Sequence, residues 1–436
     1  MLNKLFSIVI FRNHIVFTIF GIKISFKMFN NDDYVIKEEN LCANYNCNKI
    51  LESKIKKQIK KNKKCRVAFY VFEIAKWKTD SLYQLLKKDS RYEPFIVIGM
   101  TPGRTKTYSK KEIELRFENQ INYFKAKGME VVIGYDIDNH KQIPLKTFKP
   151  DIVFYQQHVG ICKENNIKRV MRYALTAYVP YNVPNYGNAC YDYNVFCSQL
   201  YRFYTLNNAM KNYYIETINP SIANIVEVGH TALDYFYLNK GAKRQEHVIY
   251  APHFSIMHPK VKNEFYYSTF NQNCDIILEF AKQHPEISWV FKPHPNLKES
   301  LKKMKIPNEC IEAYYNEWKS IGKVCEDSDY QELFINSKAM ITDCGSFLTE
   351  YFCTGNPLIH LVNPLSINWS CEAMRPMFET FYKVNNNNEL IDVLQQIIIN
   401  GDDYKKTLRE KTSNKYVFAN TYAAQNIKND LDGLFN

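Results

Sequence analysis

Three short motifs in the second half of the chain carry residue types that can hold a diphosphate and move a proton. They are Ala251-Pro252-His253-Phe254-Ser255, Lys292-Pro293-His294-Pro295, and the stretch from Thr342 to Glu350. Each follows an apolar run that is typical of a buried parallel strand. Because ligands of open parallel sheets bind outside the carboxyl ends of the strands, we expect the three motifs to form one site.

The lysine–histidine motif places a cation beside an imidazole. Its two prolines push Lys292 and His294 away from helical geometry into an extended path. Lys292 then serves as a point charge, and His294 as a hydrogen-bond donor to a phosphoryl oxygen or a leaving group. The alternative is a rigid turn that carries a surface histidine.

His253 and Ser255 end the first of the three motifs. An imidazole titrates near neutral pH, so His253 is a candidate proton acceptor or donor. The alternative is a loop histidine bonded to backbone. Metal binding by His253 and His258 is a weaker hypothesis, because no carboxylate or cysteine set has ligand spacing. We expect neither a bound metal nor a cofactor.

The third motif predicts a strand, a polar turn and a short helix. Such a turn presents free backbone N–H groups and a helix dipole to an anion. We expect Ser346 to be the N-cap and Gly355 to follow the helix end. Glu350, one turn after Ser346, is placed to accept hydrogen bonds from ribose hydroxyls, although it also fits an ordinary helix carboxylate.

One candidate lies in the first half of the chain. His158 follows an apolar strand at residues 151–155, after Gln156 and Gln157. It is a candidate base for an acceptor hydroxyl, and a plain loop histidine is the alternative.

The elements that position these residues alternate between strand and helix, first over residues 66–230 and again from residue 247. This alternation predicts two doubly wound α/β domains. We expect an N-terminal extension at residues 1–64, a first domain at 65–240, and a second domain at 246–403. Residues 404–436 are expected to form a helical segment that packs back on the first half.

The composition predicts a cytoplasmic protein. Its 436 residues include twelve scattered cysteines without a C-x-x-C pair, which indicates reduced thiols. Residues 1–28 are apolar, but Arg12, Asn13 and His14 interrupt them before a membrane-spanning length is reached. Residues 22–27 alternate as a strand does.

A net charge of +12 is concentrated in the lysines of residues 54–64. The pattern fits a solvated helix face, or attraction to anionic lipid headgroups or a polyanionic acceptor. No nucleic-acid-binding module accompanies it, so nucleic acid is not an expected partner. We expect a cytoplasmic enzyme that contacts the inner face of the plasma membrane.

Taken together, the motifs resemble those of the CDP-glycerol glycerophosphotransferase family, which builds teichoic-acid-like and capsular polymers. The resemblance covers roughly residues 66–400 and is strongest after His247. It implies a GT-B architecture, in which two Rossmann-like domains face a cleft. The domain at 65–240 would then bind the acceptor, and the domain at 246–403 would hold most of the donor nucleotide.

The resemblance also implies an activity: transfer of glycerol phosphate, or another polyol phosphate, from a CDP-activated donor. The acceptor would be a saccharide or polyol phosphate, either free or lipid-linked. The expected catalytic residues are His253, His294 and His158. The expected donor-binding residues are Lys292, Ser255, Thr342, Asp343, Gly345, Ser346 and Glu350.

Two other functions remain open from the sequence. One is a GT-B glycosyltransferase that uses a nucleotide sugar in capsule or lipopolysaccharide assembly. The other is a catalytically silent nucleotide-binding scaffold subunit of an assembly complex.

Overall fold

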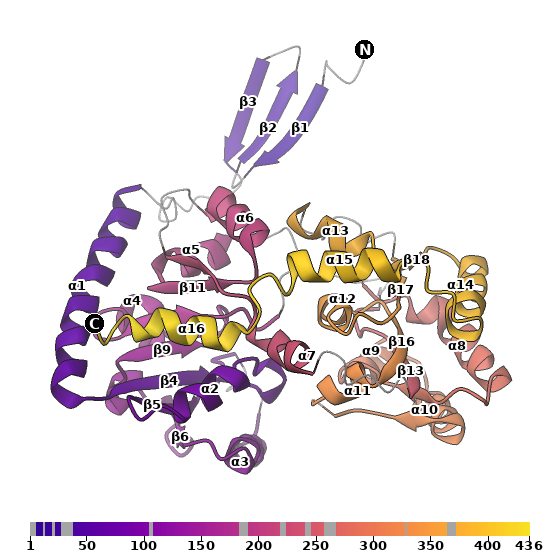
Figure 1. Ribbon diagram of the computed structural model, residues 1–436, viewed down its shortest axis with the longest axis horizontal. Helices are drawn as coiled ribbons and strands as arrows, with labels where there is room; N and C mark the ends of the chain where they lie inside the picture. Colours follow the sequence, from indigo (N-terminus) through magenta and orange to yellow (C-terminus); the bar gives the residue numbers. More distant parts are fainter. Residues whose placement is uncertain are drawn as a thin grey trace.

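The computed structural model describes residues 6–11, 14–19, 22–27, 38–103, 108–182, 191–218, 224–239, 246–256, 267–327, 329–363 and 372–436. The expected domain boundary at residues 240–245 and the weak metal candidate His258 lie outside these ranges. Figure 1 shows two α/β halves side by side, with a small sheet at the amino terminus.

The first half is built on a seven-stranded parallel sheet. Its strands are β4 (Cys65–Val71), β5 (Tyr92–Ile98), β6 (Val131–Ile133), β9 (Ile152–Tyr155), β10 (Leu175–Tyr178), β11 (Arg202–Thr205) and β12 (Ile225–Glu227). Their spatial order is β6-β5-β4-β9-β10-β11-β12, so the strand order reverses between β4 and β9. All residues of β9 and β10 are buried, because helices cover both faces of the sheet.

Helices of the first half are α1 (Glu38–Asn62), α2 (Asp80–Lys87), α3 (Lys110–Ala126), α4 (Ile167–Val170), α5 (Tyr191–Gln199), α6 (Asn208–Ile218) and α7 (Asp234–Leu238). Along α1, Leu51, Ile55 and Ile59 recur every four residues and are buried. Lys54, Lys57, Lys60 and Lys61 of α1 are exposed. The lysine run is therefore a helix face, and its contact with anionic lipid stays a prediction.

The second half repeats the architecture with six parallel strands. They are β13 (His247–Ala251), β14 (Trp289–Phe291), β15 (Lys323–Val324), β16 (Ser337–Thr342), β17 (Leu358–Leu361) and β18 (Tyr382–Val384). The spatial order is β15-β14-β13-β16-β17-β18, and the order reverses between β13 and β16. Both sheets thus have the strand order of a dinucleotide-binding fold, which places a ligand crevice at each reversal.

Helices of the second half are α8 (Phe270–Gln283), α9 (Leu297–Lys303), α10 (Asn308–Ile321), α11 (Gln331–Ile335), α12 (Gly345–Phe352), α13 (Arg375–Phe378) and α14 (Asn387–Leu394). Two more helices end the chain, α15 (Lys406–Tyr416) and α16 (Ala423–Asp432). In Figure 1, α15 lies over the second half, whereas α16 crosses back over the first. There Ala424, Ile427 and Leu431 of α16 are buried in the same cluster as Leu82 of α2.

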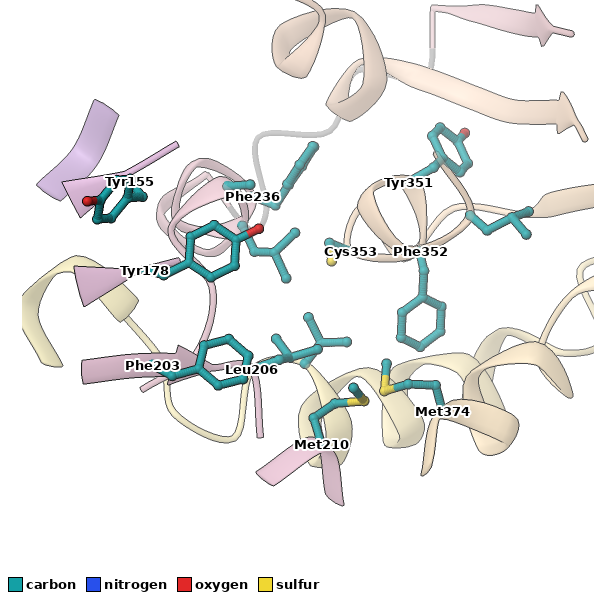
Figure 2. Packing of buried hydrophobic residues seen from close by; sticks show 14 of the residues in the cluster. Tyr155, Tyr178, Phe203, Leu206, Met210, Phe236, Tyr351, Phe352, Cys353 and Met374 are labelled. Atoms are coloured by element: carbon teal, nitrogen blue, oxygen red, sulfur yellow. The ribbon is translucent and has the colours of Figure 1, made fainter. Parts of the chain in front are cut away.

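One apolar cluster extends from the first half into the second (Figure 2). Phe203 and Met210 belong to the first half, and Phe352 and Met374 to the second; all four are buried in it. Tight apolar packing of this kind resists displacement, so it forms a stable base on which the two sets of strand ends are held.

The amino-terminal residues that are described form an antiparallel three-stranded sheet. Its strands are β1 (Phe6–Phe11), β2 (His14–Ile19) and β3 (Ile22–Lys27), and β3 confirms the alternation read from the sequence. A two-stranded ribbon, β7 (Tyr135–Asp136) and β8 (Lys141–Gln142), completes the sheets. None of the described helices has both the length and the hydropathy to cross a bilayer.

Candidate functional site

The reversal point of the second sheet is closed by a buried carboxylate. Asp343 follows β16 and accepts hydrogen bonds from the backbone N–H of His253 (2.6 Å) and of Thr269 (2.6 Å). The Thr269 hydroxyl donates to the same carboxylate at 3.0 Å. Asp343 is 2% exposed, and burial raises its pKa to about 6. The side chain therefore holds the loop after β13 against the loop after β16, and acts through the residues that it positions.

His253 and His294 stand next to each other at the ends of β13 and β14, with ring centroids 5.0 Å apart. The Nδ1 atom of each ring accepts a backbone N–H from two residues ahead. Ser255 donates to His253 at 3.2 Å, and Asn296 donates to His294 at 3.1 Å. A backbone N–H can only donate, so the proton of each neutral imidazole is on Nε2.

The Ser255 side chain supports the same tautomer. Its Oγ lies 2.7 Å from His253 Nδ1 and accepts the N–H of Tyr267 at 2.9 Å. Because Nδ1 already accepts a backbone N–H, the Ser255 hydroxyl donates to it. No described residue accepts the Nε2–H of either His253 or His294.

Both imidazoles are neutral at physiological pH. Burial lowers the pKa of His253 to about 3, and the nearby His294 adds to the effect. Burial also lowers the pKa of His294 to about 4, with a smaller contribution from the charge of Lys292. The pair therefore presents two uncharged N–H donors. Within the described ranges, no group of three or more His, Cys, Asp or Glu side chains could hold a metal ion.

Lys292, two residues before His294 in the sequence, is 4% exposed. Its Nζ donates to the carbonyl of Asp327 at 2.8 Å and lies 5.1 Å from the centroid of the Tyr330 ring. Burial lowers the pKa of Lys292. The ammonium is thus a buried cation next to the strand ends.

The turn that opens α12 differs from the prediction in one respect. The helix begins at Gly345, so Ser346 lies inside its first turn and is not the N-cap. The Thr342 hydroxyl fixes the turn instead: it accepts the N–H of Cys344 at 2.9 Å and donates to the carbonyl of Ala251 at 2.6 Å. Gly355, with φ +72°, adopts the left-handed conformation expected just beyond the helix end.

Glu350 is fully buried, and both of its oxygens have partners. Tyr330 donates its hydroxyl to one oxygen at 2.7 Å, and Lys78 Nζ lies 3.1 Å from the other. Lys78 belongs to the first half, in the segment between β4 and α2.

Lys78 and Tyr330 were both missed from the sequence. Lys78 follows the first strand of its sheet, on the side where ligands of parallel sheets bind, and this position could have marked it as a candidate. Tyr330 precedes α11 and carried no signal of its own.

The reversal point of the first sheet has its own bridging side chain. Gln156, after β9, accepts the backbone N–H of Phe72 at 2.7 Å and of Glu73 at 3.1 Å. His158 follows two residues later, and its ring stacks on Tyr181 with centroids 6.4 Å apart. The second-half candidates thus meet around one reversal point, and His158 stands at the other.

A cavity of about 390 Å³ lies between the halves, beside Lys78 and Tyr330. The first half contributes α2, the end of α3 and α7 to its wall, and the second half contributes residues 329–331. Lys127 Nζ crosses this space, 3.4 Å from Asp80 and 3.7 Å from Asp329. Beside this cavity the two halves therefore contact each other through polar side chains.

Comparison with known proteins adds a sequence relative. Residues of this chain are 24% identical over 176 positions to the minor teichoic acid biosynthesis protein GgaB of Bacillus subtilis (strain 168). The match takes in 40% of this chain and 18% of GgaB, so the chain spans under a fifth of that relative. No family model matches.

Solved structures share the fold of this chain. The wall teichoic acid polymerase TagF superposes with a TM-score of 0.53 at 11% identity, over 92% of this chain and 99% of the TagF chain. A TagF structure soaked with CDPG gives the same TM-score. The resemblance read from the motifs thus has a sequence counterpart in GgaB and a fold counterpart in TagF.

The fold itself is shared more widely. UDP-GlcNAc 2-epimerase from Neisseria meningitidis, bound to UDP-GlcNAc, superposes with a TM-score of 0.54 at 14% identity, over 85% of this chain and 100% of that one. The two Rossmann-like halves are thus the GT-B architecture that the sequence predicted.

Proposed function

We propose that this protein transfers glycerol phosphate, or another polyol phosphate, from a CDP-activated donor to an acceptor hydroxyl in the synthesis of a cell-surface polymer. The observation that carries the proposal is the pair of neutral imidazoles whose Nε2–H groups are accepted by no described residue. Two such donors beside a buried lysine suit the oxygens of a diphosphate. The similarity to GgaB and TagF supports this class of substrate.

The donor's diphosphate is assigned to the ends of β13, β14 and β16. His253 and His294 donate from Nε2 to phosphoryl oxygens, Lys292 supplies positive charge, and the first turn of α12 at Gly345 and Ser346 supplies backbone N–H groups. Ser255, Thr342 and Asp343 position these groups through the hydrogen bonds described above. Glu350 accepts from the ribose hydroxyls.

The reaction is an in-line phosphoryl transfer. The acceptor oxygen attacks the β-phosphorus of the donor and forms a new P–O bond. The bond from that phosphorus to the bridging oxygen breaks, and CMP leaves with the electron pair. Of the two histidines predicted as a base, we assign the acceptor proton to His158, because His253 already carries its proton on Nε2.

A nucleotide sugar is the alternative donor, since the epimerase shares the fold to the same extent as TagF does. The reaction products separate the two functions. A polyol phosphate transferase releases CMP and keeps one phosphate in its product, whereas a glycosyltransferase releases a nucleoside diphosphate.

The test is to incubate the purified full chain with CDP-glycerol, other CDP-polyols and UDP- or CDP-sugars, together with polyol phosphate and saccharide acceptors. We expect CMP from a CDP-polyol. Release of a nucleoside diphosphate from a sugar donor would replace the proposal with the glycosyltransferase. Binding of CDP without turnover of any donor would favour the scaffold subunit.

A further inference from the structure

Lys78 of the first half closes over the carboxylate that the proposed function assigns to ribose. Its Nζ lies 3.1 Å from Glu350 Oε1 and donates to the Tyr330 hydroxyl at 2.8 Å. Tyr330 in turn donates to Glu350 Oε2 at 2.7 Å. The Lys78 side chain is 15% exposed and that of Glu350 only 2%.

In this arrangement a ribose has no access to Glu350. An ammonium and a phenol donate to its two oxygens, and its side chain is only 2% exposed. A donor nucleotide therefore has to break the Lys78–Glu350 ion pair, which joins the two halves, to reach the carboxylate.

Once displaced, the Lys78 ammonium needs another anion. Lys78 Nζ and Lys292 Nζ lie 5.2 Å and 5.1 Å from the centroid of the same Tyr330 ring, so both cations border one aromatic side chain. An anion bound beside this ring lies within reach of both ammonium groups. A nucleoside diphosphate at the strand ends would bring that anion.

We propose that Lys78 is a donor-site residue that exchanges partners: it pairs with Glu350 in the empty site and with the donor's diphosphate in the occupied one. The inference rests on the proposed function, because it assumes a nucleotide whose ribose reaches Glu350. It makes the first half a contributor to donor binding and couples donor entry to the contact between the halves.

The exchange predicts opposite effects of one substitution on two ligands. In Lys78→Met the competing cation is gone, so cytidine should bind about threefold tighter or more, since it no longer has to displace the ion pair. CDP loses its charged partner and should bind about tenfold weaker or more, as expected for a charge-assisted hydrogen bond. Isothermal titration calorimetry of both ligands on the full chain measures the two changes.

Lys127→Met is the matched control. It also removes a lysine that pairs across the halves, with Asp80 and Asp329, but it contacts neither Glu350 nor Tyr330 through any described bond. Both affinities should stay within about twofold of the wild type, because exposed ion pairs contribute little. Lys78→Arg keeps the charge and should move both affinities less than Lys78→Met does. Circular dichroism confirms that each variant is folded.

The outcomes are distinct. Parallel changes for cytidine and CDP in Lys78→Met, or no change relative to Lys127→Met, overturn the exchange while leaving the proposed function intact. A wild-type chain that binds neither CDP nor UDP removes the proposed function, and the exchange with it. If UDP binds in place of CDP, the same crossed comparison with uridine decides the exchange.

Discussion

Three of the described histidines share one local arrangement at Nδ1 and differ in the partner of their Nε2–H group. In His230, as in His253 and His294, Nδ1 accepts the N–H from two residues ahead, here from Ala232 at 3.2 Å. The His230 Nε2–H, however, is directed to the carbonyl of Pro180 at 2.8 Å. The backbone thus sets the tautomer of all three rings, and the surroundings decide which N–H groups are left for a ligand.

The donor role of His294 can be tested by substitution. His294→Ala removes one N–H from the diphosphate and should lower turnover of the donor about 100-fold or more, as is typical for a group that acts in the transition state. His294→Gln, which keeps an N–H donor, should retain part of the activity. The measurement is kcat for CMP release.

His284→Ala serves as the control for that experiment. His284 lies at the end of α8, where its Nδ1 is 2.9 Å from Glu286. Its loss should leave turnover near that of the wild type. Equal activity of the His294→Ala and His284→Ala variants would remove His294 from the mechanism.

His230 makes folding stability depend on pH. Burial lowers its pKa to about 4, whereas an unfolded chain has a value of roughly 6.5. Between these values the unfolded chain binds the extra proton, so stability falls as pH drops from 6.5 toward 4. This histidine alone accounts for a loss of about 2 kcal/mol between pH 7 and pH 5.

A double difference isolates that contribution. His230→Gln has no titrating group, so its free energy of unfolding should fall by about 2 kcal/mol less than that of the wild type over the same interval. Urea unfolding at pH 7 and pH 5 gives the four values. Identical pH dependence in the two proteins would mean that His230 does not titrate on unfolding.

At the scale of elements, α16 shows how the end of the chain is fixed to the first half. The Asp234 carboxylate, at the start of α7, accepts the N–H groups of Ala423 (2.7 Å) and Ala424 (3.1 Å). Ser81 of α2 donates its hydroxyl to the same group at 2.7 Å. One buried side chain therefore caps α16 and joins it to two other helices, close to the wall of the cavity.

Asp234→Ala should be strongly destabilising. It leaves two N–H groups of α16 without their acceptor in a buried place, and we expect a loss of about 2–4 kcal/mol from the missing cap and the unsatisfied donors. Ser81→Ala keeps the cap and should cost about 1 kcal/mol. Chemical unfolding of the two variants measures the difference, and equal losses would show that the cap does not hold α16.

Across the whole molecule, two kinds of contact join the halves. Residues such as Phe203 and Phe352 pack in one apolar cluster, whose contacts a charged ligand cannot replace (Figure 2). The strand-end side is held by polar contacts: Lys78 with Glu350, Lys127 with Asp329, and Gln331 Nε2 donating to the carbonyl of Ala232 at 2.9 Å. A charged ligand can replace such polar contacts, so this side of the cleft is the one that donor binding can open.

The sequence by itself determined the architecture and the strand-end positions of several candidate residues. Continuous apolar runs specify strands buried on both faces, and parallel strands present the residues that follow them at one edge. That reasoning placed His253, Lys292, His294 and Asp343 correctly in relation to the second sheet. It also anticipated Gly355, because a left-handed position after a helix favours glycine.

Only the tertiary structure decided the chemistry of those residues. The tautomers of His253 and His294 depend on hydrogen-bond directions that residue spacing does not encode. Ser346 is not the N-cap of α12, because the helix begins one residue earlier and the Thr342 hydroxyl holds the turn before it. The pairing of Lys78 with Glu350 joins residues 272 positions apart, one from each half. A contact of that range depends on how the two halves pack against each other, and the local patterns that predict strands and helices carry no information about it.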